Sequence, residues 1–202
     1  MAVSPRFVEA LSFATFLHKD QVRKGTPIPY VAHLLAVCSI AFEHGATEDE
    51  AIAALLHDAV EDQGGAPVLE EIRKRFGDQV AMIVAGCTDA DTVPKPPWEQ
   101  RKRAYVEHLL TAPDAVRLVS CADKLHNARS ILADYRVYGE DVWARFKGGR
   151  AGTLWYYRAL ADTFLDLGPK RIADELNRVV NELEHLAGCN GSSTASLAQT
   201  CS

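Results

Sequence analysis

The sequence lacks the features that would mark a metal finger, a membrane protein or a nucleic-acid binder. Its five cysteines form no Cys-x-x-Cys pair, so they predict unpaired thiols in a reducing cytoplasm. No apolar run approaches the ~20 residues that a membrane helix needs. The net charge of −5 gives no basic surface for nucleic acid, although it permits a small anionic ligand. We therefore expect a cytoplasmic protein without a membrane or nucleic-acid partner.

Neither the alternation typical of strands nor an internal repeat appears in the sequence. Helix signals recur instead. Ser4 and Pro5 open a first helix, Thr47 and Glu50 form a capping box for a third, and Gly77 separates two short ones. Other helices are expected over residues 30–44, 98–111, 114–137, 141–147, 153–167 and 169–187. We predict one all-α helical bundle of about ten helices over residues 1–187, followed by a disordered tail at 188–202.

The stretch "ALLHDAVEDQ" (residues 54–63) places four ionisable side chains in an otherwise apolar helix. At about 100° per residue, His57, Asp58, Glu61 and Asp62 share one face, and leucine, isoleucine and valine occupy the other. A solvated acidic face is the ordinary explanation of such a pattern. Two other segments favour a binding site instead.

Those two segments also carry polar side chains on apolar helix faces. His33 shares a stripe with Val37, so its ring should point inward, where most histidines are simply hydrogen-bonded core residues. In "CADKLHNARS" (residues 121–130), Asp123, Asn127 and Ser130 lie on one face of an apolar helix. A buried carboxylate needs a partner, because an unpaired one is costly.

A single cation shared among the three segments would satisfy these buried charges. Two imidazoles, from His33 and His57, and two carboxylates, from Asp58 and Asp123, form a nitrogen and oxygen set that suits Mn²⁺, Fe²⁺ or Zn²⁺. Such an ion can lower the pKa of a bound water towards ~7. Glu61, one turn after His57, could then orient or deprotonate that water.

The spacing H…HD…D resembles that of the HD phosphohydrolase superfamily. The segments "HKDQVRKGTPIPYVAH", "ALLHDAVEDQ", "FGDQVAMIVAGCTD" and "ADKLHNARS" follow the order and spacing of the hydrolase domain of Rel/SpoT-type alarmone enzymes. The resemblance covers about residues 7–137. It implies a small, stand-alone HD domain, without the synthetase and regulatory domains of the long enzymes.

The resemblance also implies a role for each matching position. The resemblance implies metal ligands, usually for Mn²⁺ (His33, His57, Asp58 and Asp123), a catalytic acidic pair (Glu61 and Asp62), and substrate-binding residues (Arg23, Lys24, Asn127 and Ser130). The acidic pair would activate water, and the arginine of the basic pair Arg23–Lys24 would pack on the nucleotide base. His18 would hold the Arg23–Lys24 loop by a hydrogen bond. Of two further candidates for a metal centre, His108 and His126, we favour a supporting role.

The implied reaction is removal of the 3′-pyrophosphate from (p)ppGpp or a related alarmone. Departures from the family pattern at Leu34, Gln63, Ser120, Lys124 and Ala128 leave the ligands and acids intact but leave the substrate open. One alternative is an HD phosphohydrolase that acts on another nucleotide or a phosphorylated dinucleotide. Another is a non-catalytic nucleotide-sensing module, which the complete ligand set disfavours.

One glycine-rich loop is a further candidate for phosphate binding. It runs from Lys147 to Arg150 and leads into a helix that Thr153 would cap. A helix N-terminus offers free backbone N–H groups to an anion. A solvent loop followed by core aromatic residues explains the same pattern nearly as well.

Overall fold

The computed structural model describes residues 3–89 and 94–196, with side chains described as far as residue 188. These residues form nine α-helices and one 3₁₀ helix, which confirms the all-α class and the expected number of helices. In chain order the elements are α1 (Pro5–Leu17), α2 (Val31–Glu43), α3 (Glu48–Leu56), α4 (Ala59–Gln63), α5 (Ala66–Cys87), α6 (Trp98–Thr111), α7 (Asp114–Tyr138), η1 (Gly139–Arg145), α8 (Gly149–Leu167) and α9 (Lys170–Ser196).

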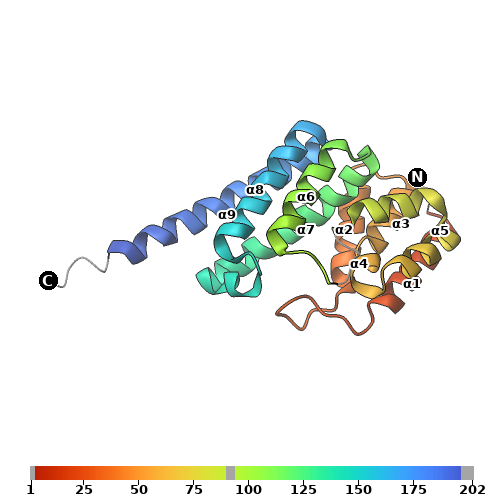
Figure 1. Ribbon diagram of the computed structural model, residues 1–202, viewed down its shortest axis with the longest axis horizontal. Coiled ribbons are helices and arrows are strands. Elements are labelled where there is room, and N and C mark those ends of the chain that lie inside the picture. Colours follow the sequence, from red (N-terminus) through yellow and green to blue (C-terminus); the bar gives the residue numbers. More distant parts are fainter. Residues whose placement is uncertain (1–2, 90–93, 197–202) are drawn as a thin grey trace.

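Helix α7 joins the two halves of the molecule (Figure 1). On one side it packs against α2, α3 and α5, and on the other against α8, α9 and η1. The C-terminal part of α9 projects away from the bundle. Because both halves contact α7, polar side chains on its packed faces, such as those of Ser120 and Asp123, lie deep in the protein.

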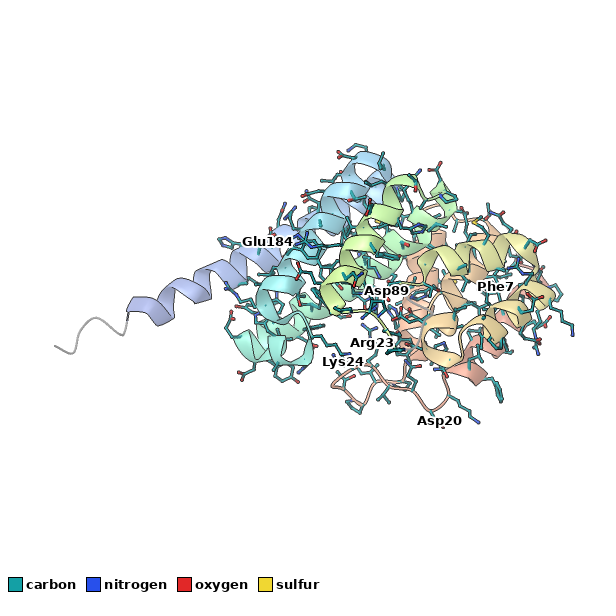
Figure 2. All side chains as sticks on the ribbon, in the orientation of Figure 1. Phe7, Asp20, Arg23, Lys24, Asp89 and Glu184 are labelled. Atoms are coloured by element: carbon teal, nitrogen blue, oxygen red, sulfur yellow. The ribbon has the colours of Figure 1, made fainter. Side chains whose placement is uncertain are left out.

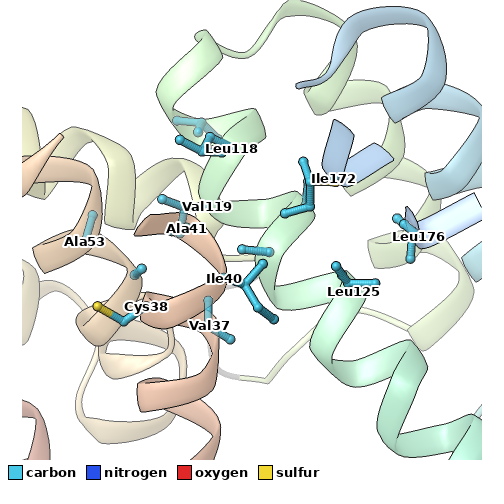
Figure 3. Close-up of a cluster of buried hydrophobic side chains, with 14 of the residues drawn as sticks. Val37, Cys38, Ile40, Ala41, Ala53, Leu118, Val119, Leu125, Ile172 and Leu176 are labelled. Atoms are coloured by element: carbon cyan, nitrogen blue, oxygen red, sulfur yellow. The ribbon is translucent and has the colours of Figure 1, made fainter. Parts of the chain in front are cut away.

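Helix α7 is largely buried between Val116 and Ala128, although its sequence mixes apolar and polar residues. Val119 faces α2, where Val37 lies, and Leu125 lies towards Ile172 and Leu176 of α9 (Figure 3). The same burial encloses Asp123, whose exposed fraction is 5%.

The HD stretch departs from the single helix that its sequence pattern predicts. Thr47 and Glu50 form the expected capping box at the start of α3, but α3 ends at Leu56 and α4 begins at Ala59. The ring Nδ1 of His57 donates a hydrogen bond to the carbonyl oxygen of Ala54, at 2.8 Å. In a continuous helix that carbonyl accepts from residue 58, so the ring replaces the backbone bond. His57 and Asp58 therefore lie at a break.

Three other boundaries differ from expectation. The segment predicted as a helix over 141–147 is the 3₁₀ helix η1, and α8 begins at Gly149, so Thr153 lies inside the helix and does not cap it. Helix α9 continues to Ser196, over residues for which the tail composition predicts disorder, because extending an existing helix costs little. Residues 197–202 lie outside the described residues, and the division at residue 187 stays a prediction.

Among the described helices, none combines the length and apolarity that crossing a membrane requires.

A close approach between α5 and α7 supplies the first test of this architecture. A Cβ at Gly86 would lie 2.7 Å from Val116 Cγ2, so Gly86→Ala should push α7 away. We expect it to lower the free energy of unfolding by about 1–3 kcal/mol, measured by urea denaturation. Gly188→Ala is the control, because no atom lies within 4 Å of its Cβ and alanine favours the helix. Equal stability of the two variants would contradict the described packing.

Candidate active site

Four side chains predicted as metal ligands meet between the two halves of the bundle. The Nε2 atoms of His33 and His57 are 3.3 Å apart. Asp58 Oδ2 lies 3.0 Å from His57 Nε2 and 3.5 Å from His33 Nε2. Asp123 Oδ1 lies 3.2 Å from His33 Nε2 and 3.6 Å from His57 Nε2. Helices α2 and α7 and the break between α3 and α4 thus bring two imidazoles and two carboxylates to one point.

Each imidazole is held by its other ring nitrogen. His57 Nδ1 donates to the Ala54 carbonyl, which leaves its Nε2 as an acceptor when the ring is neutral. His33 Nδ1 lies 2.7 Å from His126 Nδ1. Burial and the neighbouring His33 lower the pKa of His126 to about 4, so a neutral His126 can accept the His33 proton. Both Nε2 lone pairs are then free for a metal ion, as ligand histidines require.

Side chains that are not themselves ligands hold the two carboxylates in place through hydrogen bonds. Asp123 accepts from Asn127 Nδ2 through Oδ1 and from Lys124 Nζ through Oδ2, each at 2.5 Å. Asp58 Oδ2 accepts from the Tyr30 hydroxyl at 2.5 Å. These bonds reduce the conformational freedom that the carboxylates would lose on binding an ion.

The electrostatics of the cluster favour a cation. Burial alone would raise the pKa of Asp58 and Asp123, yet the neighbouring positive groups and imidazole hydrogen bonds hold both well below their usual range. Burial alone would lower the pKa of His57, but the Asp58 charge raises it well above its usual value. The cluster thus holds a proton where a divalent ion would bind. His33, His57 and Asp58 could together hold a metal ion.

The structure separates the predicted acidic pair. Glu61 faces a cavity, where its Oε1 lies 2.8 Å from Lys95 Nζ. Burial and the Asp89 charge raise the pKa of Glu61. Asp62 lies in a different surface hollow and accepts from Gln21 Nε2 at 2.8 Å. Both residues lie on α4, where adjacent side chains point about 100° apart, so Glu61 and Asp62 meet different surroundings.

Two adjoining cavities lie next to side chains that hold the ligand cluster, since Asn127 lines both cavities and donates to Asp123. The first encloses about 420 Å³ and the second about 470 Å³. They share four lining residues, Lys24, Asn127, Phe146 and Tyr157. Of the four predicted substrate-binding residues, all line the second cavity, and Lys24 and Asn127 line both. In Figure 2, Arg23, Lys24 and Asp89 lie near one another where the halves of the molecule meet.

The two cavities differ in character. In the second, the Arg23 guanidinium lies 5.8 Å from the centre of the Tyr30 ring and donates to Asn127 Oδ1 at 2.7 Å. Ile28 and Ile131 add apolar surface there. The first cavity is strongly basic: its described lining includes six lysine and arginine residues (Lys24, Lys95, Arg101, Lys102, Lys124 and Lys147) and one carboxylate, that of Glu61.

Comparison with known proteins agrees with this geometry. The HD domain family matches residues 10–154 of the chain. The chain belongs to the HD domain family. A relative from Xenopus tropicalis, named guanosine-3′,5′-bis(diphosphate) 3′-pyrophosphohydrolase MESH1, is 42% identical over 173 residues, covering 80% of this chain and 94% of the relative. The human protein of the same name is 38% identical, covering 69% and 80%.

Solved structures resemble the whole HD domain. One, described as a metazoan ortholog of SpoT that hydrolyses ppGpp, has a TM-score of 0.76 and 28% identity and covers 90% of this chain and 97% of that one. Another, from Listeria monocytogenes, has a TM-score of 0.66 and 31% identity, with 77% and 99% covered. The expected HD fold is therefore confirmed.

The sequence motifs did not identify several residues that lie at this site. Lys95, Arg101 and Lys102 reach the first cavity from "PKPPWEQRKR", where an exposed basic helix start is the simpler interpretation. Lys124, noted only as a departure from the family pattern, is partly buried and pairs with Asp123. Asp89 accepts from two of these cations. Such groupings arise from tertiary contacts, and sequence spacing does not reveal them.

The remaining candidates divide between the site and other roles. His18 Nδ1 lies 2.7 Å from Gln21 Oε1, in the turn before Arg23, and His126 supports His33 as expected. His108 lies outside the cluster and contacts the Gly86 carbonyl. Of the glycine-rich loop, Lys147 lines the first cavity, but Arg150 donates to the Ala187 carbonyl instead.

The proton held by His57 makes metal binding depend on pH. Its raised pKa keeps the imidazole charged to higher pH in the metal-free protein, so a metal ion must displace that proton. We expect the apparent affinity for Mn²⁺ to rise between pH 6 and pH 8. Calorimetry in buffers of different ionisation enthalpy should show proton release on binding.

His108→Gln is the matched control for this measurement, because it removes an imidazole that lies outside the cluster. The variant should release as many protons as the unmodified protein. Metal binding without any proton release would contradict the described coupling between His57 and the aspartates.

Proposed function

We propose that the chain is a metal-dependent nucleotide phosphohydrolase that removes the 3′-pyrophosphate of (p)ppGpp or a related alarmone. The observation that carries this proposal is the cluster of His33, His57, Asp58 and Asp123 beside a basic cavity that holds Glu61. The names of the MESH1 relatives support the choice of substrate. We also propose a cytoplasmic location and a small-molecule nucleotide as the partner, both of which are consistent with this activity.

The four side chains would hold one divalent ion, which we propose to be Mn²⁺. Mixed imidazole and carboxylate ligands suit this ion. When bound, such an ion supplies Lewis acidity, which makes water acidic enough to react near neutral pH. Lys124 and Asn127 keep Asp123 in place, and Tyr30 does the same for Asp58.

The two cavities suggest how the nucleotide is oriented. The base would lie in the cavity lined by Arg23, Tyr30 and Ser130, where the guanidinium and an aromatic ring offer flat surfaces. The phosphates would lie in the basic cavity, since its excess of lysine and arginine offsets their charge. Lys24 and Asn127 line both cavities and would contact the ribose and the phosphate attached to it.

The reaction requires a base, and Glu61 is placed to act as one. Burial raises the pKa of its carboxyl, which makes the ionised form a stronger base. Glu61 would take a proton from the attacking water as a bond forms between the water oxygen and the phosphorus next to the ribose. The P–O3′ bond breaks, and the 3′ oxygen keeps the electron pair and takes up a proton.

The separation of Glu61 from Asp62 predicts unequal effects of two similar substitutions. Glu61→Gln should lower kcat by at least ~100-fold, because the base is lost. Asp62→Asn should lower it much less, because Asp62 acts through Gln21 and the turn before Arg23. Steady-state hydrolysis with both variants at equal metal content checks this. Equal losses would contradict the role given to Glu61.

A nucleotide panel tests the substrate and distinguishes the alternatives. The Mn²⁺-loaded protein should release pyrophosphate from nucleotides with a 3′-diphosphate, as resolved by anion exchange. Asp123→Asn should abolish this release and lower the bound metal, as measured by elemental analysis. Preferential turnover of another nucleotide or a phosphorylated dinucleotide would change the substrate, and no turnover of any nucleotide would favour a nucleotide sensor.

A further inference from the structure

Two buried hydroxyls at the first cavity have no described hydrogen-bond partner. Thr153 Oγ1 and Tyr156 Oη are both enclosed, and the side chains to which they belong line this cavity. Leaving a buried hydroxyl without a hydrogen-bond partner is destabilising, so a partner is expected in the working state of the protein. Both residues lie on α8, after the glycine-rich loop that the sequence marked as a phosphate-binding candidate.

Two cations face the same cavity from α6. Arg101 and Lys102 are 11% and 18% exposed, and Lys102 Nζ lies 4.9 Å from the centre of the Tyr156 ring. Cations this enclosed are uncommon on a protein surface. Their position next to two hydroxyl donors is the arrangement that a phosphate group requires.

A buried carboxylate holds the two cations in place. Asp89, which is 5% exposed, accepts from Arg101 Nη1 and from Lys102 Nζ, each at 2.5 Å. Burial alone would raise the pKa of Asp89, but the two cations lower it, so the carboxylate stays ionised. The pair therefore remains charged and fixed before any ligand binds, which reduces the entropy lost on binding.

The position of Glu61 shows where Arg101 and Lys102 lie relative to the phosphorus that would react. Arg101 Nη1 lies 4.0 Å from Glu61 Oε1. The α6 cations thus stand beside the proposed base, and the Arg23 cavity lies across Lys24 and Asn127. A group bound by Arg101 and Lys102 is then attached to the phosphorus that reacts near Glu61.

We propose that Arg101, Lys102 and Tyr156 form an anion subsite that binds the distal phosphate of the 3′-diphosphate. This inference rests on the proposed function. Thr153 supplies a second hydroxyl, and Asp89 is a positioning residue for the two cations. The subsite selects a diphosphate over a monophosphate at the 3′ position, because a single phosphate beside Glu61 does not reach it.

Inorganic pyrophosphate and inorganic phosphate are the probes that test the subsite directly. Binding of each to the purified Mn²⁺-loaded protein is measured by calorimetry, so turnover is not needed. Lys102→Gln should weaken pyrophosphate binding about tenfold, as expected for a lost charge-assisted hydrogen bond. Binding of phosphate should change less than twofold. Tyr156→Phe keeps the ring, removes only the hydroxyl and should weaken pyrophosphate binding in the same way, with a smaller effect.

Arg103→Gln is the matched control. It removes a cation from the next position of α6, where the guanidinium lies over Trp155 and pairs with Glu99, and it should leave binding of both probes unchanged. Unaltered pyrophosphate binding in both Lys102→Gln and Tyr156→Phe would overturn the proposal. So would an equal loss for phosphate and pyrophosphate.

Hydrolysis separates this proposal from the proposed function. Lys102→Gln should raise KM about tenfold for two substrates that share a 3′-diphosphate but carry either a 5′-diphosphate or a 5′-monophosphate. A penalty seen only with the 5′-diphosphate would place the subsite at the other end of the nucleotide and overturn the proposal. If the unmodified protein hydrolyses neither substrate yet still binds pyrophosphate through Lys102, the function is wrong and the anion subsite stands.

Discussion

Two carboxylates brought into the interior of a helical bundle determine much of this structure. Asp58 and Asp123 lie beside two buried imidazoles, at distances of 3.0–3.6 Å, where an uncompensated charge would be strongly destabilising. The surrounding side chains hold these groups in place without neutralising all of them. A cation is the simplest partner for such a set, and in its absence His57 retains a proton.

The arrangement of the helices brings these side chains together. Asp123 comes from the middle of α7, which is buried because both halves of the molecule pack on it. His57 and Asp58 reach the same point because the helix breaks there, and His33 reaches it from α2. His33 and Asp123 come from helices, and hydrogen bonds to the Ala54 carbonyl and from Tyr30 hold His57 and Asp58 at the break, which limits the movement of the site.

The distribution of charge explains how an acidic protein can bind a polyanion. The chain carries a net charge of −5, yet six lysine and arginine residues line one cavity with a single described carboxylate. Some of these cations are paired with acids, as Lys124 is with Asp123 and Lys95 is with Glu61. Binding therefore depends on local potential, and the overall charge is a poor guide to it.

The sequence allowed the fold class and the ligand cluster to be predicted, because both depend on local patterns. Helix signals identified most of the elements, and the H…HD…D spacing identified the four converging side chains. The different environments of Glu61 and Asp62 were not predicted, since they depend on distant segments that pack around α4: Lys95 pairs with Glu61, and Gln21 donates to Asp62. Nor was the cation pair on Asp89, because the three residues meet only where the segment after α5 contacts the start of α6.

The most direct test of the metal centre is a crystal structure of the Mn²⁺-loaded protein with diffraction recorded at the manganese absorption edge. We expect one anomalous peak, within about 2.0–2.3 Å of the Nε2 atoms of His33 and His57 and of one carboxylate oxygen each from Asp58 and Asp123. A peak elsewhere in the protein, or none at this cluster at saturating Mn²⁺, would contradict the account.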